Sequence, residues 1–210
     1  MVPPLPAGDG GGMDRLRRAV CRFSNGDTHA GRRATVERLL AAVPPSELRA
    51  AARALTSSDP APPVVPRVPL TVLAAALGVA DPATVATLVP PVAAAYLRPT
   101  APAGTTADAA ADELVRRVGV AAATVLVQSC LPVAALVTAA LDRGLDGALA
   151  DATPPVPATR RWSPATGETV TVPLAGIPFG EGPRRCPGEQ HARALAAGLL
   201  DALRPELPTD

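Results

Sequence analysis

The chain has 210 residues, of which 48% are hydrophobic and only 2% aromatic, so alanine, valine and leucine must supply the core of a single domain. Its formal net charge of +1 argues against a nucleic-acid partner bound through its phosphates. Three cysteines at unrelated spacings are not a disulfide framework, and they indicate a reducing, cytoplasmic environment.

The first quarter of the sequence predicts two helices after a leader. Residues 1–14 lack the basic and apolar regions of a signal peptide, and we expect a disordered leader there. Residues 26–43 predict a helix opened by Asp27 or Thr28, and residues 45–55 predict another.

Prolines divide the next part of the chain. Residues 57–69, "SSDPAPPVVPRVP", predict a proline-rich linker that is not helical. Short helices are expected over residues 70–79 and 82–97, and the second should be interrupted at Pro90 and Pro91.

Residues 118–141 carry no charge over 24 positions, which is enough to cross a bilayer. The segment is also rich in alanine, holds Gln128, Ser129 and Pro132 at its middle, and stands alone. We favour the alternative of a long central helix that is apolar on all sides because the domain surrounds it. The acidic "ADELVRR" before it and the "DRG" after it are typical of helix ends.

The last third of the sequence predicts a small β region and a final helix. Residues 153–176 have strand character and suggest a hairpin that turns at Thr166 and Gly167. Residues 189–203 predict a helix that starts just after Cys186. The expected fold is therefore mostly α with a small β region, as one domain over residues 15–210.

One cysteine lies in an unusual setting, the stretch "IPFGEGPRRCPGEQHA" over residues 177–192. Cys186 precedes a predicted helix and has arginines beside it, and both features favour the thiolate. A thiolate there suits a nucleophile or a metal ligand, but His191 should lie along the helix rather than beside the sulfur, and zinc needs more ligands. A haem needs one thiolate, with cations for its two propionates. A glycine-rich turn around a buried cysteine is the plainer alternative.

The stretch resembles the cysteine-ligand loop of the cytochrome P-450 superfamily, whose pattern is F-G-x-G-x-R-x-C-x-G. All six specified positions match: Phe179, Gly180, Gly182, Arg184, Cys186 and Gly188. The resemblance implies haem b as cofactor with Cys186 as the axial ligand of its iron. It further implies that Phe179 shields the sulfur, that Arg184 binds a propionate, and that Gly180 and Gly188 let the backbone approach the cofactor.

Other segments agree with this resemblance in chain order, from about residue 22 to the C-terminus. "FSNGDTHAGRR" is similar to the family's C-helix, in which His29 and Arg33 would face the propionates from one side of the helix. "PPVPATRRW" resembles the segment in which an arginine, here Arg161, faces a propionate. "DELVRRVGVAAATVLVQSCLPVAALV" resembles the I-helix that crosses the distal haem face. The implied fold is an abridged P-450-like fold with a long central I-type helix.

The sequence also departs from the family. It is about half the usual length, and the family's E-x-x-R pair is replaced by Ala148 and Asp151. Glu113 and Arg116 do spell E-x-x-R, but they precede the I-type helix, and we interpret them as a helix surface pair. Where the family carries an acid and an alcohol for proton delivery, this chain has Leu131 and Pro132, neither of which can carry a proton.

Three functions follow from these observations. The first is an oxidative tailoring enzyme, monooxygenase-like, that acts on a small molecule of secondary metabolism with a ferredoxin or another electron donor. The second is a haem-thiolate enzyme with peroxide-driven or non-oxidative chemistry, and the third is a P-450-like partner that stabilises another enzyme. Gln128 and Ser129 are the candidates for a proton relay or substrate contact, and their alternative role is to satisfy a helix kinked at Pro132.

Overall fold

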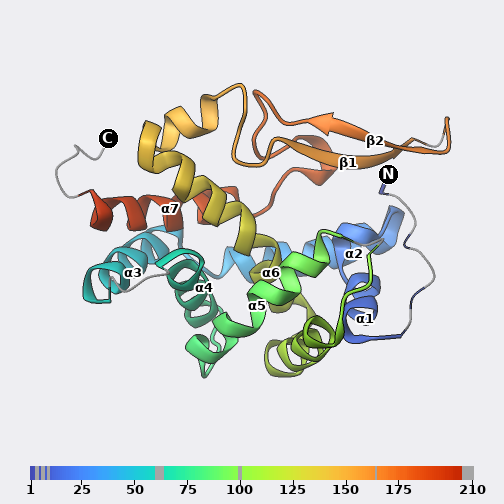
Figure 1. Ribbon diagram of the computed structural model, residues 1–210, viewed down its shortest axis with the longest axis horizontal. Coiled ribbons are helices and arrows are strands. Elements are labelled where there is room, and N and C mark those ends of the chain that lie inside the picture. The colour runs from blue at the N-terminus through green and yellow to red at the C-terminus, as the bar shows by residue number, and fades with distance from the viewer. Residues whose placement is uncertain are drawn as a thin grey trace.

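The computed structural model describes residues 1–2, 5, 8, 10–59, 64–98, 101–163 and 165–204. The molecule is mostly helical with one two-stranded antiparallel sheet, as the sequence predicts (Figure 1). The N-terminal half contains α1 (Gly12–Ala19), the short 3-10 helix η1 (Cys21–Phe23), α2 (Gly26–Ala41), α3 (Pro45–Ser58), α4 (Val64–Ala76) and α5 (Pro82–Tyr96). The C-terminal half contains α6 (Thr105–Ala150), β1 (Ala158–Ser163), β2 (Glu168–Pro173), the 3-10 helix η2 (Gly182–Arg184) and α7 (Glu189–Leu203).

Helix α6 runs through the centre of the molecule and contacts α1, α2, α4, α5 and α7 (Figure 1). Its inward face is made of small and branched apolar residues, including the fully buried Leu114 and Leu126. Large side chains from the surrounding helices complete the core, among them Met13, Leu16, Leu48, Leu73, Tyr96, Leu195 and Leu199. Aliphatic burial therefore stabilises the fold, at about 25 cal/mol per Å² of apolar surface removed from water.

Helix α6 is interrupted, but at glycines rather than at its proline. Gly119 has φ 75° and Gly144 has φ 73°, so the helix consists of the segments 105–118, 120–143 and 145–150. The backbone around Pro132 stays helical, so the proline at which the sequence predicts a kink does not break the helix. Left-handed backbone is open to glycine at little cost, and Gly144 gives the helix stop that the sequence predicts.

An 18-residue window of α6 has a mean hydropathy of 2.1, and 50% of that window is buried. By length and composition the helix is long enough to cross a membrane, a test that the core helix of a soluble protein also passes. The burial of half of the window agrees with a helix that the domain surrounds.

Two predicted proline interruptions are wrong. Helix α4 is assigned from Val64 and contains Pro66 and Pro69, but Val65 has non-helical angles (φ −109°, ψ 129°), so residues 66–69 of the expected linker are helical; residues 60–63 lie outside the described residues. Helix α5 continues through Pro90 and Pro91. Proline is tolerated in a first helical turn, as at Pro66, and burial of the neighbouring apolar residues against α6 offsets the hydrogen bonds lost further along.

The remaining element predictions are close to the structure. Helix α7 has the predicted bounds. Helix α2 begins at Gly26, the first residue of the expected range, but it ends at Ala41 and is preceded by Asn25 rather than opened by Asp27 or Thr28, with no side-chain cap. The predicted hairpin is present: the N–H of Gly167 donates to the carbonyl of Ser163 at 2.9 Å, and Gly167 has φ 67°. At the N-terminus, α1 begins at Gly12, inside the expected leader, and Met13 is fully buried; residues 3, 4, 6, 7 and 9 lie outside the described residues.

Candidate functional site

The loop that carries Cys186 is a tight turn in front of α7. Gly180 and Gly182 have φ of 70° and 61°, which side chains with a Cβ rarely adopt, and this explains two glycines of the pattern. The N–H of Cys186 donates to the carbonyl of Phe179 at 2.8 Å and closes the turn. Gly188 is the residue in front of α7, and Cys186 is exposed. The glycine-rich turn therefore holds an exposed cysteine, which contradicts the alternative of a turn around a buried one.

The Cys186 thiol differs from the expectation in its electrostatics. Desolvation by the surrounding chain raises the pKa of the thiol even though the residue as a whole is exposed. A hydrogen bond from the backbone of Gly188, together with the charges of Arg33 and Arg185, lowers this pKa, and Glu189 raises it. The net result is a thiol pKa above its ordinary value, so these cations do not produce a free thiolate. A metal ion at the sulfur reverses this balance, since a coordinating thiol is deprotonated.

Arg184 ties the cysteine loop to the start of α2. Its Nη2 donates to the carbonyl of Ser24 at 2.8 Å and to Oδ1 of Asn25 at 2.9 Å. The guanidinium is half-buried, and desolvation lowers the pKa of Arg184, with the charges of Arg33 and Arg22 acting in the same direction. Among the described residues Arg184 forms no ion pair with a carboxylate, so its charge remains available to an added anion.

His29 and Arg33 lie on α2, one turn apart, and both are half-buried. Desolvation lowers the pKa of His29, and the positive charges of Arg184 and Arg33 lower it further. Arg33 pairs with Glu37 across one helical turn, with 2.7 Å between Nε and Oε1. The C-helix pair of the sequence prediction therefore lies within electrostatic range of Arg184, which is 151 residues further along the chain than Arg33.

Arg161 lies on β1 and joins the same group of cations. Its Nη1 donates to the hydroxyl of Thr159 at 2.7 Å and to the carbonyl of Arg160 at 2.9 Å. Desolvation lowers the pKa of Arg161, and the charges of Arg184 and Arg22 lower it as well. The choice of Arg161 over Arg160 agrees with exposure, because Arg161 is half-buried and Arg160 is exposed.

Electrostatic interactions with Arg184 thus link the four cations predicted from separate segments: Arg184 itself, His29, Arg33 and Arg161. Arg22 is a fifth member that the sequence prediction missed, and its charge acts on both Arg161 and Arg184. The one feature of the sequence that could have pointed to Arg22 is its position directly before the C-helix-like segment. We call these five residues the cation cluster. Because like charges repel, such a cluster is typical of a site for an anion.

Two further side chains support the loop from α7. The guanidinium of Arg193 lies over the ring of Phe179, with its Cζ 5.3 Å from the ring centroid. Nε2 of His191 lies 3.0 Å from the carbonyls of both Leu40 and Val43, at the end of α2. His191 therefore joins α7 to α2 and does not serve Cys186 as a base, as the sequence analysis expects.

Other arginines near the loop are already paired. Arg185 forms an ion pair with Glu189, with 2.7 Å between Nη2 and Oε2, and Arg193 pairs with Glu189 and Asp146. The E-x-x-R spelling of Glu113 and Arg116 is a surface pair within α6, with 2.6 Å between Oε1 and Nη2, as predicted. Its two arginine neighbours lower the pKa of Glu113 to about 2.

Gln128 and Ser129 are both half-buried in the middle segment of α6. The hydroxyl of Ser129 donates to the carbonyl of Leu126 at 2.9 Å, so it satisfies its own helix. The amide of Gln128 makes no hydrogen bond with the described part of the chain and is available to a ligand. Leu131, three residues after Gln128 on the same helix, is 40% exposed and leaves an apolar surface beside it.

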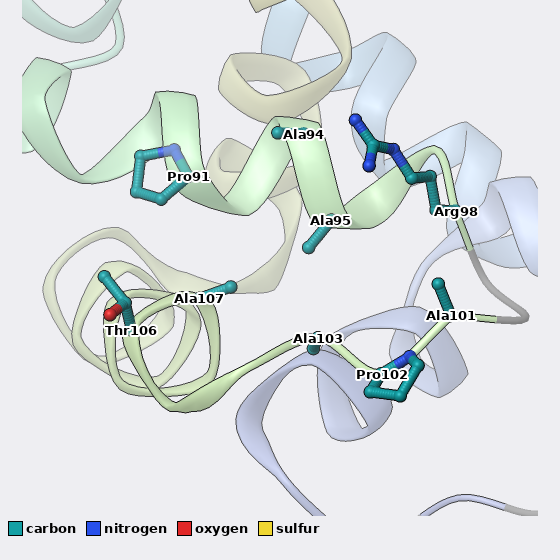
Figure 2. Close-up of a pocket in the computed structure, with 9 residues that line it drawn as sticks. All are labelled: Pro91, Ala94, Ala95, Arg98, Ala101, Pro102, Ala103, Thr106 and Ala107. Carbon is teal, nitrogen blue, oxygen red and sulfur yellow. The ribbon is translucent and has the colours of Figure 1, made fainter.

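A cavity of about 280 Å³ lies on another part of the molecule. Figure 2 shows it between the end of α5 and the start of α6, lined largely by alanine and proline, with the guanidinium of Arg98 directed away from its centre. The predicted site residues do not line this cavity. Within the described ranges, no three His, Cys, Asp or Glu side chains are grouped closely enough to hold a metal ion.

Compared with protein-family models, with curated proteins and with solved structures, the chain matches none of them.

Proposed function

We propose that this protein is a haem-thiolate protein with Cys186 as the axial ligand of the iron, and that it is an oxidative tailoring enzyme acting on a small molecule. The observation that carries the proposal is the cation cluster. Four cations that the sequence resemblance assigns to haem propionates, on α2, β1 and the cysteine loop, interact electrostatically through Arg184, which supports the proposal. Their segments are far apart in the sequence, so this interaction is a property of the fold.

The residues present suit haem b in three respects. Haem needs one protein thiolate, and Cys186 is an exposed cysteine at the end of a glycine-rich turn. The backbone of Gly188 offers a hydrogen bond to the sulfur, which is the kind of contact that tunes a metal–thiolate bond. Arg161 and Arg184 have charges that carboxylates on the described residues do not neutralise, and the two propionates supply carboxylates.

The chain's own side chains then have defined roles. The cation cluster binds and orients the carboxylates, Phe179 and Arg193 cover one side of the loop, and Gln128 contacts substrate or water from α6. A thiolate-bound haem supplies oxidation of an organic substrate, because the thiolate donates electron density that favours cleavage of the O–O bond. We propose a cytoplasmic location and an electron donor such as a ferredoxin for this reaction.

A second candidate is peroxide-driven or non-oxidative chemistry at the same haem site. It is favoured by Leu131 and Pro132, which replace the acid and alcohol of the family, and by the hydroxyl of Ser129, which is committed to the helix. Hydrogen peroxide already carries the protons and electrons that a relay and a reductant would deliver. The third candidate, a non-catalytic partner of another enzyme, has less support because the whole ligand loop is intact.

The proposal is tested by loading haem into three proteins: wild type, Cys186→Ser and Cys21→Ser. Cys21 is a matched control because it is a second free cysteine that lies within the field of Arg33 and Arg184. We expect one haem per chain in wild type and in Cys21→Ser, and loss of the thiolate-type spectrum in Cys186→Ser alone. A chain that takes up no haem, or a Cys186→Ser protein with an unchanged spectrum, would overturn the proposal.

A further inference from the structure

Asn25 lies at the centre of a chain of hydrogen bonds that the haem hypothesis does not use. Its Oδ1 accepts from the N–H of Val2 at 2.9 Å and from Nη2 of Arg184 at 2.9 Å. Its Nδ2 donates to the carbonyl of Val2 at 3.3 Å. One amide side chain therefore pairs with the backbone of residue 2 on both sides and still holds the guanidinium of Arg184.

Residues 1–2 extend this chain to the sheet. The N–H of Trp162, next to Arg161 on β1, donates to the carbonyl of Met1 at 2.8 Å, and Val2 is buried at 7% exposure. Figure 1 shows the N-terminal end of the chain beside β1 and α2. We call Met1 and Val2 the N-terminal strap.

The hairpin needs such a connection to place Arg161. The side chain of Arg161 donates only within its own strand, to Thr159 and Arg160, and the hairpin lies along the edge of the molecule in Figure 1. Within the described residues, the hairpin makes one hydrogen bond to a distant segment, from the N–H of Trp162 to the carbonyl of Met1. The position of Arg161 relative to Arg184 is therefore set through the N-terminal strap.

We propose that Asn25 is a positioning residue, which holds Arg161 and Arg184 at a fixed separation by clamping the N-terminal strap between β1 and the cysteine loop. This role of Asn25 rests on the proposed function in one respect, that the ligand of Arg161 and Arg184 is the pair of haem carboxylates. The clamp itself is a property of the haem-free protein. Asn25 suits it because an amide offers both an acceptor and a donor, whereas a carboxylate offers acceptors alone.

The test uses haem-free protein in four forms: wild type, Asn25→Leu, Asn25→Asp and Gln190→Leu. Gln190→Leu is the matched control, because Gln190 is an exposed amide on α7 that takes no part in these hydrogen bonds. The first measurement is hydrogen exchange at the amide of Trp162. We expect exchange at least about tenfold faster in Asn25→Leu, corresponding to about 1.4 kcal/mol. Asn25→Asp keeps acceptors for the N–H of Val2 and for Arg184 but loses the donor to the carbonyl of Val2, so its exchange should lie between wild type and Asn25→Leu. Gln190→Leu should stay near wild type.

The second measurement is an NMR titration of His29, with His191 as the other histidine signal of the chain. The charge of Arg184 contributes to the lowered pKa of His29, so release of Arg184 in Asn25→Leu should raise that pKa. Arg184→Gln gives the upper limit of this change. Because the carboxylate introduced by Asn25→Asp would itself raise the pKa of His29, that variant is read by exchange alone.

Unchanged exchange at Trp162 in Asn25→Leu, or an unchanged His29 titration, would overturn the proposal. Deletion of residues 1–2 breaks the clamp from its other side and should give the same rise in Trp162 exchange, which covers an Asn25→Leu protein that fails to fold. The presence of Met1 in the other proteins is checked by intact mass. Failure of wild type to bind haem would refute the proposed function. The role of Asn25 would still be tested by hydrogen exchange at Trp162 and by the titration of His29.

Discussion

At the residue scale, the candidate site depends on positive charges held close together without enough carboxylates. Desolvation and mutual repulsion lower the pKa values of Arg161 and Arg184, which means that the surrounding protein disfavours their charged forms. An anion that enters the cluster would relieve this repulsion, which favours its binding. Arg33 of the cluster and Arg185 lower the pKa of Cys186, but desolvation outweighs them, and a metal ion bound to the sulfur would reverse this balance.

The first prediction concerns Arg184 and Arg33. Removal of either guanidinium by Arg184→Ala or Arg33→Ala should weaken haem retention by about 10- to 150-fold, because a hydrogen bond to a charged group contributes about 1.5–3 kcal/mol. The rate of haem transfer to an apoprotein acceptor measures the effect, and circular dichroism checks the fold. Arg38→Ala is the control, since Arg38 is an exposed arginine of α2 that donates to the Thr35 hydroxyl. Equal retention in all three variants would remove these arginines from the site.

The second prediction is a pH dependence carried by His29. In the haem-free protein its pKa lies below the ordinary 6.5, because of desolvation and of Arg184 and Arg33, and bound carboxylates should raise it. Haem binding then takes up a proton at His29, so this residue contributes more affinity as the pH falls through the region around 6.5. The affinity ratio of wild type to His29→Gln isolates this contribution, because proton release from Cys186 is common to both proteins. A ratio that is constant between pH 5 and 8 would contradict the assignment.

At the element scale, α7 positions the cysteine loop through its contact with α3. Gly198 faces the backbone of α3 so closely that an added Cβ would lie 2.3 Å from the carbonyl oxygen of Arg49 and 2.9 Å from the Cβ of Ala52. One turn away, Asp201 forms an ion pair with the same Arg49, with 2.7 Å between Oδ2 and Nε. These contacts hold the C-terminal half of α7 against α3, and the helix in turn positions the cysteine loop at its start.

The third prediction follows from that contact. Gly198→Ala should lower the free energy of unfolding by about 1–3 kcal/mol, because the close approach of α7 and α3 leaves no room for a methyl group. It should also increase haem loss, since α7 carries the loop of Cys186. Gly31→Ala is the control on α2, where an added Cβ meets no atom within 4 Å and alanine is the better helix former. Urea unfolding of both variants measures the difference, and equal stability of the two would show that the contact is loose.

The fourth prediction concerns the middle segment of α6. Because the hydroxyl of Ser129 is bonded to Leu126, the single change Gln128→Leu should slow turnover as much as Gln128→Leu with Ser129→Ala, and both should leave haem content intact. Hydrogen peroxide should support turnover at least as well as dioxygen with a reductant, because Leu131 and Pro132 carry no proton. Tightly coupled turnover with dioxygen would show that a relay exists elsewhere in the chain.

At the scale of the whole molecule, the sequence predicts the helical class, the hairpin, α7 and the cysteine turn, because each has a strong local signal. Gly180 and Gly182 adopt the positive φ that their pattern suggests. The predicted interruption at Pro90 and Pro91 is wrong because packing of the surrounding helix against the core outweighs the loss of single hydrogen bonds. At Pro132, where the sequence predicts a kink, the backbone angles stay helical. The break at Gly144 falls where the sequence predicts the helix to end, whereas the break at Gly119 lies inside the expected helix and was not predicted.

The site was predictable where a residue type has a motif and not where a role depends on tertiary contact. His29, Arg33, Arg161 and Arg184 come from four motif positions, and the fold brings them within electrostatic range of one another. Asn25 has no motif, because its partners are the backbone of residue 2 and a guanidinium 159 positions away. The thiol pKa of Cys186 was also missed, since desolvation depends on the packing around the sulfur.

The most direct test of the account is the visible spectrum of the purified, haem-loaded protein, reduced and exposed to carbon monoxide. An iron bound by the Cys186 thiolate should give the thiolate-type carbon monoxide spectrum of the P-450 superfamily, and Cys186→Ser should lose it while Cys21→Ser keeps it. A protein that binds no haem, or whose spectrum is that of a haem with a nitrogen ligand, would contradict the assignment of Cys186 as the axial ligand.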